Sequence, residues 1–160
     1  NVEIFTEMAY STAAESFAAN AALPAGCVLQ SLVPGVVPRG RTPFLYGEGP
    51  EEAQRAGREL DNPFDATDTA ALRRGAEVYA LSCVLCHDAA GSGQGTIVKR
   101  GMVPPPSLTG ARAVEMKDGE MFHIITRGQG NMPGHAAQIL PEDRWKTILR
   151  VRELQEGEPR

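Results

Sequence analysis

The five residues Cys83-Val84-Leu85-Cys86-His87 decide the fold of this chain. Two cysteines separated by two residues lie on one helical turn, so their thiols can add to the two vinyl groups of one porphyrin. The histidine that follows can place its imidazole on the iron as the proximal ligand. The pattern therefore predicts one covalently bound haem c, with Cys83 and Cys86 as attachment sites and His87 as an iron ligand.

Other interpretations of this cysteine pair stay open, chance occurrence among them. A zinc site would need a second pair of ligands, and Cys27, His123 and His135 would have to be recruited without a recognisable spacing. A redox dithiol would need the βαβ context of a thioredoxin, which the sequence does not indicate. Cys27 is expected to behave as a small apolar residue, because the acidic stretch before it is not a lipidation signal.

The opposite face of the iron needs its own ligand if the haem serves electron transfer. A thioether there favours Fe(II) and raises the reduction potential. Met132 stands in the stretch GNMPG (130–134), whose turn-forming residues can aim one side chain at a plane. Met102 and His135 are the alternatives, whereas Met116 and Met121 are expected to be core residues. We therefore predict that Met132 is the second iron ligand.

Helical patterns surround the cysteine motif. Asp68 is expected to cap a helix that ends at the cysteines. Gly75 lies inside that helix, where glycine costs about 1 kcal/mol relative to alanine, which indicates close approach of another backbone. A second helix is predicted over residues 119–126 with Asp118 as its cap, and a third begins at Pro141, which suits the first helical position.

Length and composition indicate a globular protein with two different parts. The chain has 160 residues, 42% of them apolar, and a formal net charge of −4, so nothing favours a nucleic-acid partner. The pattern of residues 67–160 predicts a mainly α-helical haem domain, because no stretch there alternates clearly enough to predict a strand. Residues 1–66 are punctuated by prolines and predict a long, mostly irregular N-terminal arm. Prolines and glycines interrupt the uncharged stretch 16–38, which therefore does not predict a spanning helix.

Two short patterns in the haem domain resemble class I cytochromes c. Gly75 and Tyr79 resemble the Gly-x-x-x-aromatic pattern of the first helix, which in that family packs across the last helix. Pro106-Ser107-Leu108 resembles the Pro-x-Leu pattern of the same family. The resemblance implies that the carbonyl of Pro106 holds the His87 imidazole and that Leu108 packs on the haem. It implies a class I cytochrome c fold of three or more helices around one haem, although Arg150 stands where many members have an aromatic residue.

Stretches in both parts of the chain carry a more specific resemblance. They are Ala9-Tyr10-Ser11, Glu15-Ser16-Phe17, Val37-Pro38-Arg39-Gly40, Arg55-Ala56-Gly57-Arg58-Glu59-Leu60, Asn62-Pro63-Phe64, Met116-Lys117-Asp118-Gly119-Glu120 and Gly128-Gln129-Gly130-Asn131-Met132. These stretches resemble the monohaem cytochrome c subunit of bacterial alternative complex III, a quinol:electron-acceptor oxidoreductase of the respiratory chain.

That resemblance implies an electron carrier, not an enzyme in its own right, in the periplasm or on the outer face of the cytoplasmic membrane. It implies that the chain takes electrons from a multihaem cytochrome subunit and passes them to an oxidase or a soluble carrier. The arm is expected to bury its apolar residues on partner subunits or, alternatively, on its own haem domain; they are Ile4, Phe5, Tyr10, Phe17, Leu29, Leu32, Phe44, Leu45 and Tyr46. Two alternatives stay open: a cytochrome c domain of another dehydrogenase or oxidase complex, and a peroxidase-type haem enzyme with an open sixth site.

Overall fold

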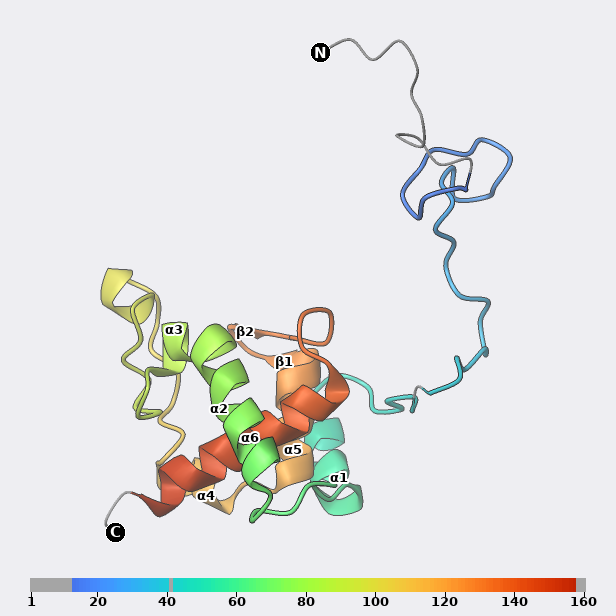
Figure 1. Cartoon of the computed structure of the whole chain (residues 1–160). Helices are drawn as coiled ribbons and strands as arrows, with labels where there is room; N and C mark the ends of the chain where they lie inside the picture. The colour runs from blue at the N-terminus through green and yellow to red at the C-terminus, as the bar shows by residue number, and fades with distance from the viewer. Residues whose placement is uncertain (1–12, 41, 158–160) are drawn as a thin grey trace. The chain divides into compact units, whose positions relative to one another are not determined.

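The structure, a computed structural model, describes residues 13–40 and 42–157. The chain divides into two compact units, Asn1–Phe44 and Leu45–Arg160 (Figure 1). Residues 45–66, which the sequence analysis assigns to the arm, therefore belong to the same unit as the haem domain. The reason is helix α1 (Pro50–Glu59), which packs on helix α5 (Asp118–Arg127).

Helix α1 has no large apolar face, and this is why sequence periodicity does not reveal it. Its buried residues are Ala53 and Ala56, and its exposed face carries ion pairs from Arg55 to Glu52 at 2.9 Å and to Glu59 at 3.7 Å. Such pairs at helical spacing stabilise a helix by a few tenths of a kcal/mol each, about 0.2–0.5. Alanine favours the helix without giving the apolar repeat that marks an amphipathic one.

The first unit is irregular over the residues described, as the sequence predicts for an arm. Its one isolated bridge in residues 13–40 and 42–44 joins Ala19 to Cys27. Cys27 is a free thiol that donates to the carbonyl of Leu29 at 3.1 Å. Large apolar side chains are exposed, and Phe17 is the most open at 84%. Ile4, Phe5 and the stretch 9–11, which the sequence analysis also uses, lie outside the described residues.

The second unit is mainly α-helical, which confirms the predicted fold class. Within the described residues it holds six α-helices, one 3₁₀ turn and a two-stranded sheet. After α1 these are α2 (Thr69–Ser82), α3 (Val84–His87), η1 (Val98–Arg100), α4 (Ala111–Glu115), α5, β1 (Gly128–Gln129), β2 (Met132–Pro133) and α6 (Pro141–Glu156). The two strands were not predicted, because a pair of two-residue strands is too short to show alternation. No helix in the described part of the chain has the length and apolarity needed to cross a membrane.

Helices α2 and α6 cross in contact, and α6 begins at Pro141 as predicted (Figure 1). Gly75 lies at the crossing: a Cβ there would lie 2.6 Å from the carbonyl carbon of Lys146 and closer still to its oxygen. The predicted cap of α2 is confirmed, since the Asp68 carboxylate accepts from the backbone N–H groups of Ala70 at 2.9 Å and Ala71 at 3.0 Å. The sequence thus places this helix pair correctly.

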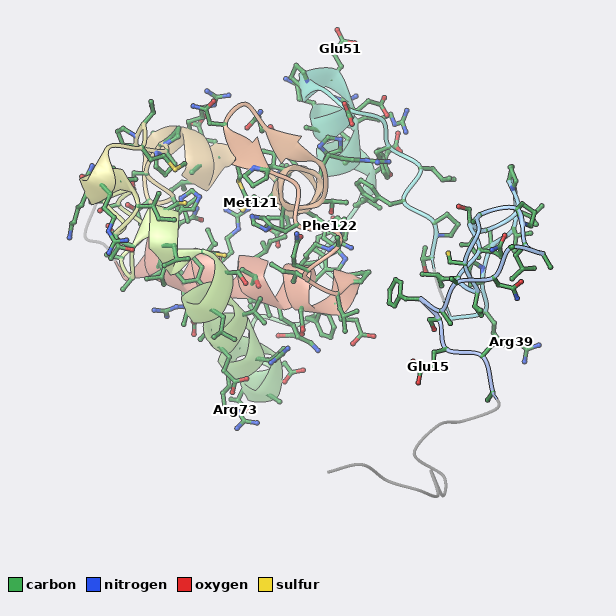
Figure 2. All side chains as sticks on the ribbon, turned by 90° about the horizontal axis from the view of Figure 1, so that it is seen from above. Glu15, Arg39, Glu51, Arg73, Met121 and Phe122 are labelled. Atoms are coloured by element: carbon green, nitrogen blue, oxygen red, sulfur yellow. The ribbon has the colours of Figure 1, made fainter. Side chains whose placement is uncertain are left out.

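Helix α5 carries the centre of the core. Its Phe122 ring stacks on Trp145 of α6 with 4.1 Å between centroids, and Figure 2 shows Met121 and Phe122 within the helical unit. Asp118 is the first helical residue of α5, and Lys117 holds the cap position that was predicted for it. The Asp118 carboxylate instead accepts from Arg152 of α6 at 2.6 Å, which takes it away from the helix amides.

Candidate haem site

The cysteine motif stands where α2 passes into the single turn of α3. Cys83 ends α2 and caps α3, and His87 is the last residue of α3. The carbonyl of Cys83 accepts from the backbone N–H groups of Cys86 at 3.2 Å and His87 at 2.9 Å. The two thiols and the imidazole are therefore brought onto one helical turn, as the spacing predicts.

The backbone beyond the motif folds back onto it. Gly93 donates to the carbonyl of His87 at 3.0 Å, and Gly95 donates to that of Cys86 at 3.1 Å. Gly95 allows this approach because a Cβ there would lie 2.5 Å from the carbonyl carbon of Leu85. Residues 88–97 thus form a loop bonded to the backbone of the haem-attachment motif.

Asp88 gives that loop its shape, and the sequence analysis does not identify it. Its backbone is left-handed at φ 58°, and its carboxylate accepts from the N–H of Ala90 at 2.6 Å and from the side-chain hydroxyl of Ser92. The hydroxyl of Ser92, together with backbone N–H groups, lowers the pKa of Asp88 to about 2. Tyr79 of α2 donates to the Asp88 carbonyl at 2.8 Å. The signal in the sequence is an aspartate before Ala-Ala-Gly-Ser-Gly, which is typical of an Asx turn.

Leu108 and Pro106 lie on the segment that runs beside this loop. Leu108 donates its N–H to the carbonyl of Gly91 at 2.8 Å, which ties it to the loop that is bonded to the motif. Pro106 is exposed, and the buried Nδ1 of His87 has no hydrogen-bond partner in the structure. The hydrogen bond implied for Pro106 is therefore not made here, and the roles of Pro106 and Leu108 stay predictions.

The thiol of Cys83 has the character of a protonated, desolvated group. Cys83 and Cys86 are both free cysteines, and burial, with a smaller contribution from Cys86, raises the pKa of Cys83 to about 12. Redox dithiols instead need a thiolate of lowered pKa, so the dithiol interpretation gains no support. In residues 13–40 and 42–157 no three His, Cys, Asp or Glu residues gather into a group that could hold a metal ion.

His87 is linked electrostatically to the segment that follows Met132. Burial lowers the pKa of His87, Asp88 raises it, and His135 is close enough to lower it again. His135 lies three residues after Met132, and its N–H donates to the carbonyl of Ile125 at 2.8 Å. The structure thus brings the stretch after Met132 towards the motif, although Met132 itself stays a predicted ligand.

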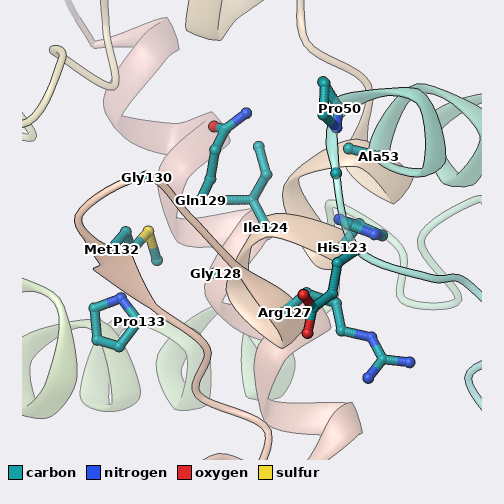
Figure 3. Close-up of a pocket in the computed structure, with 12 residues that line it drawn as sticks. Pro50, Ala53, His123, Ile124, Arg127, Gly128, Gln129, Gly130, Met132 and Pro133 are labelled. Carbon is teal, nitrogen blue, oxygen red and sulfur yellow. The ribbon is translucent and has the colours of Figure 1, made fainter.

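Met132 lies on a tight antiparallel hairpin, in which Gln129 pairs with Met132 and Gly128 with Pro133. Gly128 has φ 86°, and a Cβ there would lie 2.5 Å from the carbonyl oxygen of Met132, so glycine is required. The half-buried Met132 lines an open cavity of about 450 Å³, which Figure 3 shows with Ile124 and His123 of α5. The cysteines and His87 do not line this cavity.

Other candidate ligands lie elsewhere. His123 is buried at 1% exposure, and its Nε2 lies 2.8 Å from the carbonyl of Gly47. Met121 is buried as predicted for a core residue, whereas Met116 ends α4 and is only half-buried. Met102 is half-buried in the segment after η1.

The residues of the motif fit a covalently bound haem. Two thiols on one helical turn suit the formation of two thioether bonds to one porphyrin, and the imidazole of the next residue lies on the same turn. Cys83 and Cys86 would hold the porphyrin, and His87 would hold the iron. When bound, the haem supplies a one-electron change between Fe(III) and Fe(II).

Comparison with known proteins identifies a cytochrome c domain in this chain. The family described as "Cytochrome C oxidase, cbb3-type, subunit III" matches residues 70–149. A comparison with curated proteins gave no match. Among solved structures the chain is similar to one from the Kuenenia stuttgartiensis reducing HAO-like protein complex, at 22% identity and a TM-score of 0.49. That similarity covers 57% of this chain and 46% of the other, so the chain spans less than half the length of that protein.

The family match covers the motif, helices α2 to α5 and most of α6. Cytochrome c domains of this kind carry covalent haem c and are typically electron carriers. The chain belongs to the family of cbb3-type cytochrome c oxidase subunit III, and its residues 70–149 form a class I cytochrome c domain.

Proposed function

We propose that this chain is an electron-transfer subunit with one haem c, attached through Cys83 and Cys86 and ligated by His87 and Met132. One observation carries the proposal: the thiols of Cys83 and Cys86 and the imidazole of His87 lie together on one helical turn. The surrounding loop holds that turn with backbone hydrogen bonds, so the chain's own part is to orient the ligands and exclude water. No substrate bond is made or broken at this chain.

Spectra of variants test the attachment residues. The pyridine haemochrome spectrum of the denatured protein separates haem with two thioether bonds from haem with one, and Cys83→Ala is expected to shift it to the single-thioether form. Cys27→Ala is the matched control, because Cys27 lies in the first unit and should leave the spectrum unchanged. A haem that is extracted from the wild-type protein by acidified organic solvent would contradict the covalent attachment.

The identity of the sixth ligand has its own test. A sulfur–iron bond gives oxidised cytochromes c a weak red absorption band, which Met132→Ala is expected to abolish while Met102→Ala keeps it. Met102 is a fair control because it is also half-buried and lies in a loop segment. Rapid binding of cyanide or carbon monoxide by the wild-type protein at neutral pH would instead favour the peroxidase-type alternative.

We further propose that the chain relays electrons within a membrane quinol-oxidising complex of the alternative complex III kind, on the outer face of the membrane. The support is the set of arm stretches described above, of which 15–17 and 37–40 lie in the described part of the first unit. Exposed apolar side chains there, including Phe17 and Leu32, offer a surface for partner subunits. The stretch 16–38 carries no charged side chain, so its exposed apolar residues suit an apolar groove on a partner protein.

Affinity purification from detergent-solubilised membranes tests the assignment to a complex. The proposal expects a multihaem cytochrome, an iron–sulfur subunit and quinol-site membrane subunits to co-purify, and quinol to reduce the haem in the preparation. Co-purification with the subunits of a different dehydrogenase or oxidase would contradict it. Limited proteolysis of the isolated chain separates the two hypotheses for the arm, since an arm as resistant as the haem domain must be packed on its own chain.

A further inference from the structure

The second unit begins with a short segment that lies between two helices and is held by both. We name residues Leu45–Gly49 the strap. On one side it is bonded to α1: Arg55 donates to the carbonyl of Leu45 at 3.1 Å, and the Arg55 guanidinium lies 4.6 Å over the ring of Tyr46. The hydroxyl of Tyr46 donates to Glu59 at 2.9 Å. The strap is therefore an ordered part of the haem unit, held against α1 by these contacts.

On its other side the strap is bonded to α5, and here one residue stands out. Arg127, the last residue of α5, donates twice to the carbonyl of Tyr46, from Nε at 3.1 Å and from Nη2 at 2.7 Å. One turn earlier, Nε2 of His123 lies 2.8 Å from the carbonyl of Gly47. Hydrogen bonds from a charged donor are stronger than neutral ones, so Arg127 is the firmer of the two ties.

The same arginine sits at the base of the Met132 hairpin. Strand β1 begins at the residue after Arg127. The returning chain passes close to the Arg127 backbone, because a Cβ on Gly134 would lie 2.9 Å from the Arg127 carbonyl carbon. The hairpin therefore enters and leaves beside a residue whose side chain is fixed to the strap. Glu48 and Gly49 of the strap line the same cavity as Met132 of the hairpin. Figure 3 shows Arg127 and Met132 in the lining of this cavity.

We propose that Arg127 is a positioning residue for Met132: by its two hydrogen bonds to Tyr46 it fixes the base of the hairpin to the strap. The proposal rests on the proposed function in one respect, namely that Met132 ligates the iron. A hairpin of two residue pairs has little stability of its own, so its shape depends on what holds its base. Loosening the base raises the fraction of molecules in which the thioether is away from the iron, and competing ligands then bind more tightly in proportion to that fraction.

The experiment uses the full-length haem protein and four variants. Arg127→Met keeps the aliphatic stem and removes the donors, and Arg127→Lys keeps a charge and a single donor group. Tyr46→Leu loosens the strap from α1 while leaving Arg127 intact, and it carries the test if Arg127→Met fails to fold. Arg73→Met is the matched control, because Arg73 is exposed on α2 and lies away from the hairpin (Figure 2).

Two measurements read out the effect. Hydrogen exchange of the amides of residues 128–132 is expected to speed up by about five-fold in Arg127→Met, and the apparent Kd of imidazole for the haem is expected to fall by about five-fold. Arg127→Lys should lie between that variant and wild type, Tyr46→Leu should change both in the same direction, and Arg73→Met should stay within two-fold of wild type.

The outcomes are distinguishable. Hairpin exchange as slow in Arg127→Met as in Arg73→Met would overturn the tether, whatever ligates the iron. Faster exchange with an unchanged imidazole affinity would overturn the positioning role and leave Arg127 a merely structural residue. A wild-type protein without the red sulfur–iron band is a failure of the proposed function, and it is seen before any variant is made.

Discussion

Replacement of Gly75 by alanine tests the crossing of α2 and α6. The added Cβ would lie 2.6 Å from the carbonyl carbon of Lys146, against a normal carbon–carbon contact of about 3.5–4.0 Å, so the two backbones must separate by roughly 1 Å. Overpacking of this kind costs about 1–3 kcal/mol, and the upper end applies because a backbone carbonyl cannot rotate aside. Alanine returns about 1 kcal/mol of helix propensity. The net expectation is a loss of about 2 kcal/mol in the free energy of unfolding.

Denaturant unfolding followed by far-ultraviolet circular dichroism measures this change. The matched control is Gly57→Ala in α1, where the atoms nearest to the new Cβ would be the Cβ atoms of Glu120 at 3.1 Å and Lys117 at 3.3 Å and the Glu120 backbone nitrogen at 3.4 Å. That contact is tight but not an overlap, so the control should change stability by less than about 1 kcal/mol. If Gly75→Ala were as stable as the control, the close helix crossing described here would be refuted.

Three further predictions concern single residues. The Asp143 carboxylate accepts a hydrogen bond from Arg74 at 2.7 Å, and this contact lowers the pKa of Asp143 in the folded protein. The pair therefore stabilises the folded protein fully at pH values above the ordinary aspartate pKa of about 3.9. This stabilisation is lost as the pH falls through the lowered pKa of Asp143 in the folded state. Asp143→Asn should reduce the loss of unfolding free energy on acidification by up to about 1 kcal/mol. The effect is no larger because Arg74 is partly exposed to solvent. Tyr79→Phe removes the hydrogen bond to Asp88 and should cost about 1 kcal/mol in thermal unfolding without changing the haem spectrum. Gly95→Ala should lower the haem content per polypeptide several-fold, while Gly110→Ala, whose Cβ would lie 3.5 Å from the carbonyl oxygen of Ser107, should not.

The motif and its flanking helices could be predicted from sequence because their signals are local. Asp68 caps α2 through its own nearest amides, Pro141 fixes the start of α6, and Cys83 to His87 form a single turn. Gly75 indicated a close backbone contact because glycine inside a helix is costly and usually marks the close approach of another backbone. Each of these inferences uses residues within one or two turns of each other.

The features that the sequence did not predict depend on contacts between residues far apart in the chain, or on small side chains and backbone groups that leave no pattern in the sequence. Helix α1 buries alanines, so its periodicity is hidden, and the start of the haem unit moves to Leu45. Arg127 and Tyr46 are 81 positions apart, and the acceptor is a backbone carbonyl, which leaves no residue-type signal. Asp118 resembles a cap by its position, but Arg152 from the last helix competes successfully for its carboxylate. Tertiary contacts overrode the local pattern in each case.

The ladder of backbone hydrogen bonds behind the cysteine motif has a consequence for mutational tolerance. His87, Cys86 and Leu85 each accept from a loop amide through the main chain, at 3.0, 3.1 and 3.0 Å. Backbone carbonyl groups, which every amino acid has, therefore hold the attachment points at their spacing. Exposed side chains between them, such as that of Leu85, can be replaced without losing these hydrogen bonds. We expect natural variation to gather at such surface positions and to spare the glycines that let the loop approach.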